Sequence, residues 1–223
     1  MNIVIRRATE KDKDFVIRAI LESEKSGSDI ISYCAIFNIN ENTFKEILSK
    51  ILDENIEGQE LCLSNFLIAD VDGENAATIS AWIENEEGMA SNVIKSNLLM
   101  YFMDRATLLN AAPNISLMNE VNITRDIRAL QIECVFTEEK FRGNGLVKQL
   151  IKEHILQKQN AKADFDKAQI ILLKNNASAI RSYEKAGFTI AAENHCSNPA
   201  IFKLLPSDTK ILMHKILSSG QTN

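Results

Sequence analysis

In the N-terminal part of the chain, apolar residues are spaced as in a strand in one segment and as in a helix in two later segments. Residues 3–7 (IVIRR) are typical of a short strand. The sequence Thr9-Glu10-Lys11-Asp12 then matches a helix-capping pattern, and the apolar residues after it recur at helical spacing until Gly27. A second run at helical spacing covers 41–52. We therefore predict a strand followed by two amphipathic helices.

A β-hairpin and a long helix are predicted next. The apolar runs 66–71 and 77–83 flank Asp72-Gly73, and an Asp-Gly pair between such runs is a strong hairpin signal. Residues 91–111 carry apolar residues at helical spacing, and Pro113 follows them. This pattern predicts a single third helix that ends before the proline.

The last part of the chain alternates strands with helices. The predicted elements are a strand at 130–137, a helix at 145–158, a strand at 169–173, a helix at 178–186, and strands at 188–192 and 211–216. Residues 114–128 show no clear spacing of apolar positions, so we predict neither a helix nor a strand there. The alternation implies a right-handed crossover and one parallel strand pair, 130–137 with 169–173, inside a mixed sheet. No linker, repeat or charge block divides the chain, so we predict one α/β domain.

Composition and charge exclude several classes of protein. A length of 223 residues with 45% hydrophobic and 25% charged residues is ordinary for a globular chain, which excludes a disordered one. The net charge of −5 argues against nucleic acid as a partner, because such binding needs a basic surface. The start turns charged too early for a signal peptide, and Lys95, Asp104 and Arg105 interrupt the most apolar stretch, 93–112. We expect a cytoplasmic protein with no membrane partner.

The cysteines and histidines do not form metal-binding or disulfide patterns. No CxxC pair occurs among Cys34, Cys62, Cys134 and Cys196, so we expect free thiols. No HExxH or paired-ligand spacing occurs among His154, His195 and His214. We predict no metal site.

Two glycines gather in one loop, Arg142-Gly143-Asn144-Gly145, between a predicted strand and a predicted helix. Glycine lets backbone N–H groups turn toward one point, and the helix N-terminus adds unpaired donors and partial positive charge. Together they could cradle a phosphate or pyrophosphate. The loop does not match GxxxxGK[ST], and its glycine spacing does not match the GxGxxG of dinucleotide-binding folds.

A second motif covers 176–188, NASAIRSYEKAGF. Asn176 follows a strand, where its amide could bond a polar ligand or simply cap the next helix. Tyr183 lies two helical turns further on, and so on a similar face. A core aromatic residue is the plainer interpretation of Tyr183, and the residues alone leave both interpretations open.

The two motifs together resemble those of the GNAT superfamily of N-acetyltransferases. RGNGLV at 142–147 is similar to its acyl-CoA signature, R/Q-x-x-G-x-G/A, and 176–188 is similar to N-x-x-A-x-x-x-Y-x-x-x-G-F. Val147 departs from the pattern, because Gly or Ala is usual there. The resemblance covers about 130–188. It implies an α/β (α+β) fold with a mixed, mostly antiparallel central sheet, whose parallel pair splays to hold acyl-CoA and whose faces are flanked by helices.

For the whole chain, the resemblance implies one acetyltransferase domain over 1–223 with a helical insertion at about 84–128. It implies acetyl-CoA, or another acyl-CoA, as cosubstrate. The residues it implies for the cofactor are Arg142, Gly143, Asn144, Gly145, Leu146, Val147 and Lys148 at the pyrophosphate, backbone groups of Val135, Phe136 and Thr137 at the pantetheine, and Asn176 near the thioester.

Direct attack of a primary amine on the thioester requires a base for the amine and an acid for the thiolate. Many relatives use a tyrosine as the acid, and the resemblance implies Tyr183 for this role. Our candidate base is Glu133, which period-two alternation places on the strand face opposite Ile132. A merely paired or solvated Glu133 is about as compatible with the sequence, in which case Glu84 or Glu120 could serve.

A covalent acyl-enzyme at Cys134 is the less favoured mechanism. Cys134 alternates with Leu130, Ile132 and Phe136 on a predicted apolar face, and no histidine is near in sequence to activate it.

Two further interpretations stay open for the chain as a whole. A non-catalytic acyl-CoA-binding or regulatory protein could use the same fold, although Tyr183 favours an enzyme. The 91–111 helix could wall the acceptor pocket, form the face of a homodimer, or only pack in the core. The sequence does not identify the acceptor amine.

Overall fold

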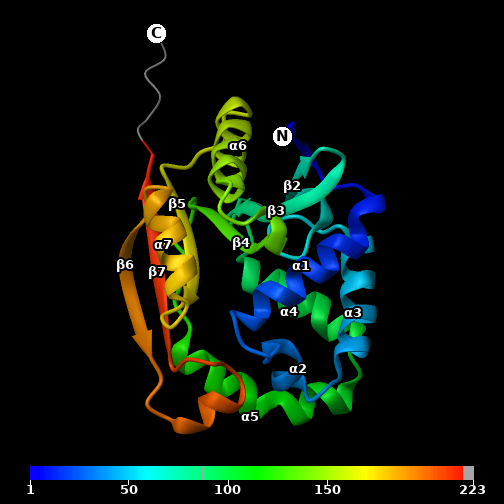
Figure 1. Cartoon of the computed structure of the whole chain (residues 1–223). Helices are drawn as coiled ribbons and strands as arrows, with labels where there is room; N and C mark the ends of the chain where they lie inside the picture. Colours follow the sequence, from blue (N-terminus) through cyan, green and yellow to red (C-terminus); the bar gives the residue numbers. More distant parts are fainter. Residues whose placement is uncertain (87, 218–223) are drawn as a thin grey trace.

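A computed structural model describes residues 1–86 and 88–217 of the chain. The described residues form a seven-stranded sheet in the order β1-β2-β3-β4-β5-β7-β6 (Figure 1). Neighbouring strands pair antiparallel except for β4 and β5, which are parallel. This confirms the predicted fold class, a mixed and mostly antiparallel sheet with one parallel pair and flanking helices.

The strands are β1 (Ile3–Arg7), β2 (Phe66–Val71), β3 (Glu74–Ile83), β4 (Leu130–Thr137), β5 (Lys167–Leu173), β6 (Thr189–His195) and β7 (Thr209–Ile216). The helices are α1 (Lys13–Lys25), α2 (Ser32–Phe37), α3 (Glu41–Glu54), α4 (Ser91–Phe102), α5 (Arg105–Val121), α6 (Leu146–Asn160) and α7 (Ala177–Lys185). Short 3-10 turns lie at Glu10–Asp12, Leu63–Asn65, Glu139–Phe141 and Pro199–Lys203.

The sheet separates two apolar clusters. One cluster joins the buried faces of α1 to α5, with Phe44 and Leu48 of α3 among its fully buried members. The other joins the opposite side of the strands to α6 and α7, and includes Leu150 and Tyr183. Burial of both clusters is the main force that fixes the helices on the two faces of the sheet. In Figure 1, α5 runs beside α2 at the bottom of the view, at the end of the molecule opposite α6.

The stretch predicted as a helical insertion, 84–128, contains two helices. The prediction of one helix over 91–111 is wrong, because the chain breaks between α4 and α5. Asp104 has extended backbone and its Oδ1 accepts from the Thr107 N–H at 2.9 Å, so it is an N-cap that starts a new helix. Pro113 lies inside α5 rather than after it. The short helix α2 has no counterpart in the predicted elements.

Candidate active site

The parallel strands β4 and β5 part soon after they meet. Their pairing in the described structure covers Leu130 with Ala168 and Gln131 with Gln169, and no β5 residue pairs with the rest of β4. At the end of the paired segment, Gln131 Nε2 donates to Gln169 Oε1 at 2.9 Å, and both side chains are buried. The buried amide pair holds the strands together there, and the strands splay beyond it.

A β-bulge lies in β4 next to this opening. Ser80 of β3 pairs with Glu133, but Thr78 pairs with Phe136, so β4 has one extra residue in this interval. Cys134 within the bulge has a left-handed φ of 52°. Glu133 and Phe136 consequently point to the same face of the sheet, since paired residues share a face.

The bulge overturns one prediction about Cys134. Leu130 and Ile132 pack in the cluster under α6, whereas Cys134 packs in the cluster under α1 to α5. The prediction that Cys134 shares an apolar face with Leu130 and Ile132 is therefore wrong, because the extra residue breaks the period-two alternation. Phe136 does lie on the α1 side with Cys134. Burial raises the pKa of the Cys134 thiol well above its usual value, so the group stays a neutral thiol.

A cavity of about 880 Å³ opens between the parted strands. Its wall includes Glu133 and Val135 of β4, Leu172 of β5, Asn176 after β5, and Tyr183 of α7. Tyr183 belongs to the cluster on the α6 side of the sheet, whereas Glu133 points to the α1 side. The two side chains can line one cavity because the sheet is open between β4 and β5.

The Tyr183 side chain is 5% exposed and packs edge-on against Phe188, with the ring centroids 6.2 Å apart. Among the described residues, no hydrogen bond joins its hydroxyl to another group, and the hydroxyl faces the cavity. Burial, with the Glu133 charge in addition, raises the pKa of Tyr183. The hydroxyl is therefore protonated at neutral pH and can donate to a bound molecule.

Glu133 forms a half-buried ion pair with Arg125, whose Nη2 lies 2.7 Å from Glu133 Oε1. Arg125 also lies over the Trp82 ring, 5.4 Å from its centroid. Burial raises the pKa of Glu133, and the Arg125 charge opposes that rise. The Arg125 Nε atom is buried without a hydrogen-bond partner among the described residues. Glu133 is thus a partly desolvated carboxylate on the cavity wall.

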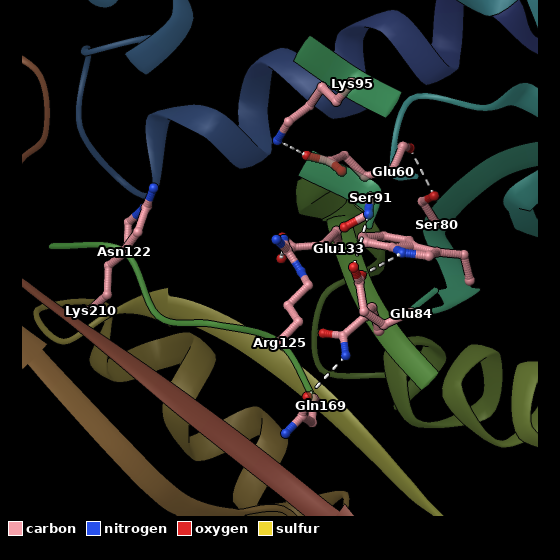
Figure 2. Close-up of polar contacts among 12 residues, drawn as sticks. Glu60, Ser80, Glu84, Ser91, Lys95, Asn122, Arg125, Glu133, Gln169 and Lys210 are labelled. Carbon is pink, nitrogen blue, oxygen red and sulfur yellow. Dashed lines mark hydrogen bonds and ion pairs between the residues drawn. The ribbon is translucent and has the colours of Figure 1, made fainter. Parts of the chain in front are cut away.

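A second ion pair, Glu60 with Lys95 of α4, lines the same cavity (Figure 2). The Ser80 hydroxyl donates to the Glu60 carbonyl oxygen at 2.9 Å, which fixes the loop that carries Glu60. Burial opposes the charge on Lys95, but the Glu60 carboxylate outweighs it and raises the pKa of Lys95. Sequence reasoning missed this pair. Its signal was a lysine in the apolar stretch that became α4.

The two alternative bases are placed differently. Glu84 lines the cavity, but its carboxylate accepts from Trp82 Nε1 at 3.2 Å and from the Ser91 N–H at 2.9 Å, so both oxygens are occupied (Figure 2). Glu120 is exposed, lies outside the cavity wall, and has Oε2 3.3 Å from the Cys196 sulfur. Neither geometry favours these carboxylates over Glu133 as a base.

Asn176 caps α7 and also reaches the cavity. Its Oδ1 accepts from the Ala179 N–H at 3.1 Å, and its Nδ2 donates to the Ser26 hydroxyl at 3.3 Å. The capping interpretation therefore holds in the structure. The side chain also ties the end of β5 to the end of α1, across the opening.

The loop before α6 has the geometry of an anion cradle. Gly143 and Gly145 have φ values of +81° and +72°, which favour glycine, and an added Cβ at either would meet open space. In the described structure the N–H groups of Gly143, Asn144 and Gly145 donate to no other backbone group. They lie beside the N-terminus of the 15-residue helix α6, which adds unpaired donors. These residues fit the pyrophosphate of an acyl-CoA.

The other predicted cofactor residues divide between the core and the exposed surface. Leu146 is buried and Val147 packs half-buried in the cluster under α6, so both side chains point away from the cradle and only their amides could serve it. Arg142 and Lys148 are exposed, and Arg142 Nε donates to the Thr137 carbonyl oxygen at 3.3 Å. The loop 142–148 is not part of the cavity wall.

Phe136 and Thr137 continue β4 from the bulge toward the loop. Phe136 packs against Phe15 of α1 with ring centroids 6.0 Å apart, and the Arg18 guanidinium lies 5.6 Å from the Phe136 ring. Thr137 pairs with Ala77 of β3. The Phe136 side chain is thus engaged with α1 and the backbone of Thr137 with β3, and the strand edge toward β5 is open.

The described residues also bear on the predictions about metal sites, cysteines and membrane spans. No group of three or more His, Cys, Asp or Glu side chains among them could hold a metal ion. The four cysteines have free thiols. Within 1–86 and 88–217, no helix has both the length and the apolar character needed to cross a bilayer.

Solved structures share this fold. An N-acetyltransferase from Staphylococcus aureus Mu50 superposes with a TM-score of 0.61 at 15% identity, over 95% of this chain and 99% of that chain. A GNAT-family acetyltransferase from Streptococcus pneumoniae gives 0.51 at 17% identity, over 97% and 100%. The ribosomal-protein-S18-alanine N-acetyltransferase from Escherichia coli gives 0.51 at 13% identity, over 100% and 99%. At these identities the likeness concerns the fold.

Sequence comparison adds the family. No curated protein sequence matches the chain. The family model described as the acetyltransferase (GNAT) family matches residues 33–188, which include both motifs, the bulge and the opening between β4 and β5. The resemblance inferred from 142–147 and 176–188 is confirmed. The chain belongs to the acetyltransferase (GNAT) family and is an acyltransferase.

Proposed function

We propose that the protein transfers the acetyl group of acetyl-CoA to a primary amine by direct attack, with Tyr183 as general acid and Glu133 as general base. The observation that carries this proposal is the shared cavity, which receives Tyr183 from one side of the sheet and Glu133 from the other. Acetyl-CoA supplies the activated thioester, and the open edge of β4 leads from the cavity toward the cradle at 142–148.

Each residue has a separate task. The amides from Arg142 to Lys148 bind the pyrophosphate, backbone groups of Val135, Phe136 and Thr137 bind the pantetheine along the open strand edge, and Asn176 holds the far side of the opening. Glu133 accepts a proton from the amine, which must be neutral to attack. The Tyr183 hydroxyl gives its proton to the departing thiolate. A backbone N–H near the β4 bulge stabilises the negative charge that develops on oxygen.

The second candidate function is binding of acyl-CoA without turnover. The ion pair of Glu133 with Arg125 favours it, because a carboxylate held by a guanidinium is a weaker base than a free one. The unpartnered hydroxyl of Tyr183 favours the enzyme. A binding protein gains nothing from a buried phenol with no hydrogen-bond partner.

Two measurements on the full chain separate the candidates. Release of free CoA thiol from acetyl-CoA is followed across a panel of primary amines, with the reaction lacking amine as the background. Calorimetry with CoA gives the affinity independently. We expect binding and amine-dependent thiol release, retained in Cys134→Ala because transfer is direct. Binding without amine-dependent release would support the second candidate, and no binding would overturn both.

A further inference from the structure

Most charged side chains on the cavity wall are neutralised by neighbours. Glu60 pairs with Lys95, and Glu133 pairs with Arg125. Glu84 is satisfied by an indole N–H and a backbone N–H. These contacts account for two acids and two bases as ion pairs. They leave Lys210, Glu24 and Glu84 on the wall without a charged partner, and of these only Glu84 has both carboxylate oxygens hydrogen-bonded.

The base without a partner is Lys210 of β7. Its Nζ donates to Asn122 Oδ1 at 3.0 Å, and no carboxylate of the described residues lies within ion-pair distance of it. Figure 2 shows Lys210 and Asn122 together at the left of the view, apart from the Lys95–Glu60 pair. Burial lowers the pKa of Lys210 to about 8, and the charges of Glu24 and Glu133 oppose this shift. An ammonium in this position would be stabilised by an added anion.

One acid without a charged partner is Glu24, in the last turn of α1. It accepts a hydrogen bond from the Ser32 hydroxyl and forms no ion pair with any described residue. Burial raises the pKa of Glu24, and the Glu133 charge adds to that rise. A carboxylate is also unfavourable at the C-terminal end of a helix, where the helix dipole is negative. A cation placed beside Glu24 would relieve both costs.

The charged groups of the cavity wall do not all pair with one another. Apart from Glu22, which pairs with Lys25 at the surface, the wall carries the acids Glu24, Glu60, Glu84 and Glu133 and the bases Lys95, Arg125 and Lys210. A purely cationic amine, such as a polyamine, would leave Lys210 without an anion. A molecule that is itself zwitterionic can place its anion at Lys210 and its cation at Glu24 at once.

We propose that the acceptor is a primary amine that also carries a carboxylate, as in an amino acid or a short peptide, with Lys210 binding the carboxylate and Glu24 and Glu133 receiving the amine. This inference rests on the proposed function for the reaction, but the binding geometry stands without it. We take the anion to be a carboxylate, for which the Lys210 corner offers one ammonium and the amide side chain of Asn122.

The test compares matched acceptors that differ in the carboxylate alone. Thiol release is measured for L-amino acids and glycyl dipeptides and for the carboxamide of each. For the wild type we expect kcat/KM to be at least about tenfold higher for the best acids than for their amides. In Lys210→Met we expect that preference to disappear, and in Lys210→Arg to persist in part. Lys203→Met, an exposed lysine outside the cavity wall, is the control and keeps the full preference.

Calorimetry with the same acids and amides keeps the inference falsifiable. If no panel member is acetylated, the proposed function fails for these amines, and binding decides the inference alone. Tighter binding of the acids that is lost in Lys210→Met supports it. Equal binding of acids and amides, no binding of either, or an equal loss for both in Lys210→Met overturns it, even if the enzyme acetylates another amine.

Discussion

Gln131 of β4 and Gln169 of β5 join their buried side chains by a 2.9 Å hydrogen bond at the last paired position of the two parallel strands. Gln169 also accepts from the Asp126 N–H at 3.0 Å and donates to Asp126 Oδ2 at 2.9 Å. The strands thus begin to separate just beyond the Gln169 side-chain amide. Its hydrogen bonds to Gln131 and Asp126 fix the position at which they part.

Gln169→Leu should loosen this junction. The change leaves the buried Gln131 side chain without its partner, and an unsatisfied buried group costs about 1–3 kcal/mol. We expect a lower free energy of unfolding in denaturant titrations and weaker CoA binding in calorimetry. Gln149→Leu, at an exposed position of α6, is the control and should change neither. Wild-type CoA affinity in a clearly destabilised Gln169→Leu would show that the junction does not set the opening.

Gly145→Ala tests the anion cradle. Alanine at a φ of +72° is strained by about 1–2 kcal/mol, and its methyl group projects into the space that a phosphate would enter. We expect CoA affinity to fall by roughly tenfold or more. Gly73→Ala in the β2–β3 turn, with a φ of +91° and equally open surroundings, should lose similar stability and keep its CoA affinity. Equal affinities of the two variants would remove the loop at 142–148 from the site.

Local signals in the sequence were sufficient for most elements. Asp72-Gly73 turns the hairpin, and the predicted strand 130–137 has the same bounds as β4. These elements could be predicted because the residues within each one determine its local conformation. Asp104 was not recognised as a helix start, because the apolar pattern continues past it. An N-cap contributes only about 1 kcal/mol, and a single capping residue is a weak signal beside such a pattern.

The cavity could be predicted in part. Tyr183, Asn176 and Glu133 were found because they lie in or beside short motifs and strands. Lys95, Arg125 and Lys210 come from a helix, an irregular segment and the last strand, and tertiary packing alone brings them to one wall. The β4 bulge was also missed, because apolar residues at 134 and 136 continue the alternation of 130 and 132 in the sequence, although the extra residue turns them to the other face of the sheet.

Tyr183→Phe should separate catalysis from binding. Removing the hydroxyl deletes the proposed proton donor, and loss of a general acid lowers kcat by about 100-fold or more. We expect the dissociation constant of CoA and the stability to stay at wild-type values, because no described group bonds the hydroxyl. Tyr101→Phe, at a tyrosine 78% exposed on α4, is the matched control. An unchanged kcat in Tyr183→Phe would assign the acid elsewhere.

Glu133 and Arg125 predict a characteristic pH dependence. The pKa of Glu133 is raised by burial and held down by Arg125, so kcat/KM should rise with pH through a pKa above the ordinary 4.5 of glutamate. Glu133→Gln should remove this limb. Arg125→Met should move it to higher pH, whereas Arg125→Lys should move it less. The profile is measured with two amines of different pKa, since a limb that shifts with the amine belongs to the substrate. A limb unaffected by both Glu133→Gln and Arg125→Met would exclude Glu133 as the base.

His154 of α6 should make the folded state sensitive to acid. Its ring is buried and Nε2 donates to the Ile79 carbonyl oxygen of β3 at 3.1 Å, and burial lowers the pKa of His154 from 6.5 to about 4. Between these values the unfolded chain binds a proton that the folded chain does not, so stability falls as the pH drops from 6.5 toward 4. The full effect is on the order of 3 kcal/mol.

His154→Gln keeps a donor for the Ile79 carbonyl oxygen and removes the titration. Denaturant unfolding at pH 7 and pH 4.5 should therefore show a smaller acid-induced loss of stability in His154→Gln than in the wild type. His214→Gln on β7 is the control and should lose as much stability as the wild type. Equal losses in His154→Gln and the wild type would mean that His154 is protonated in the folded protein. In that case the packing of α6 on β3, which places the cradle at the helix N-terminus, would tolerate a buried charge.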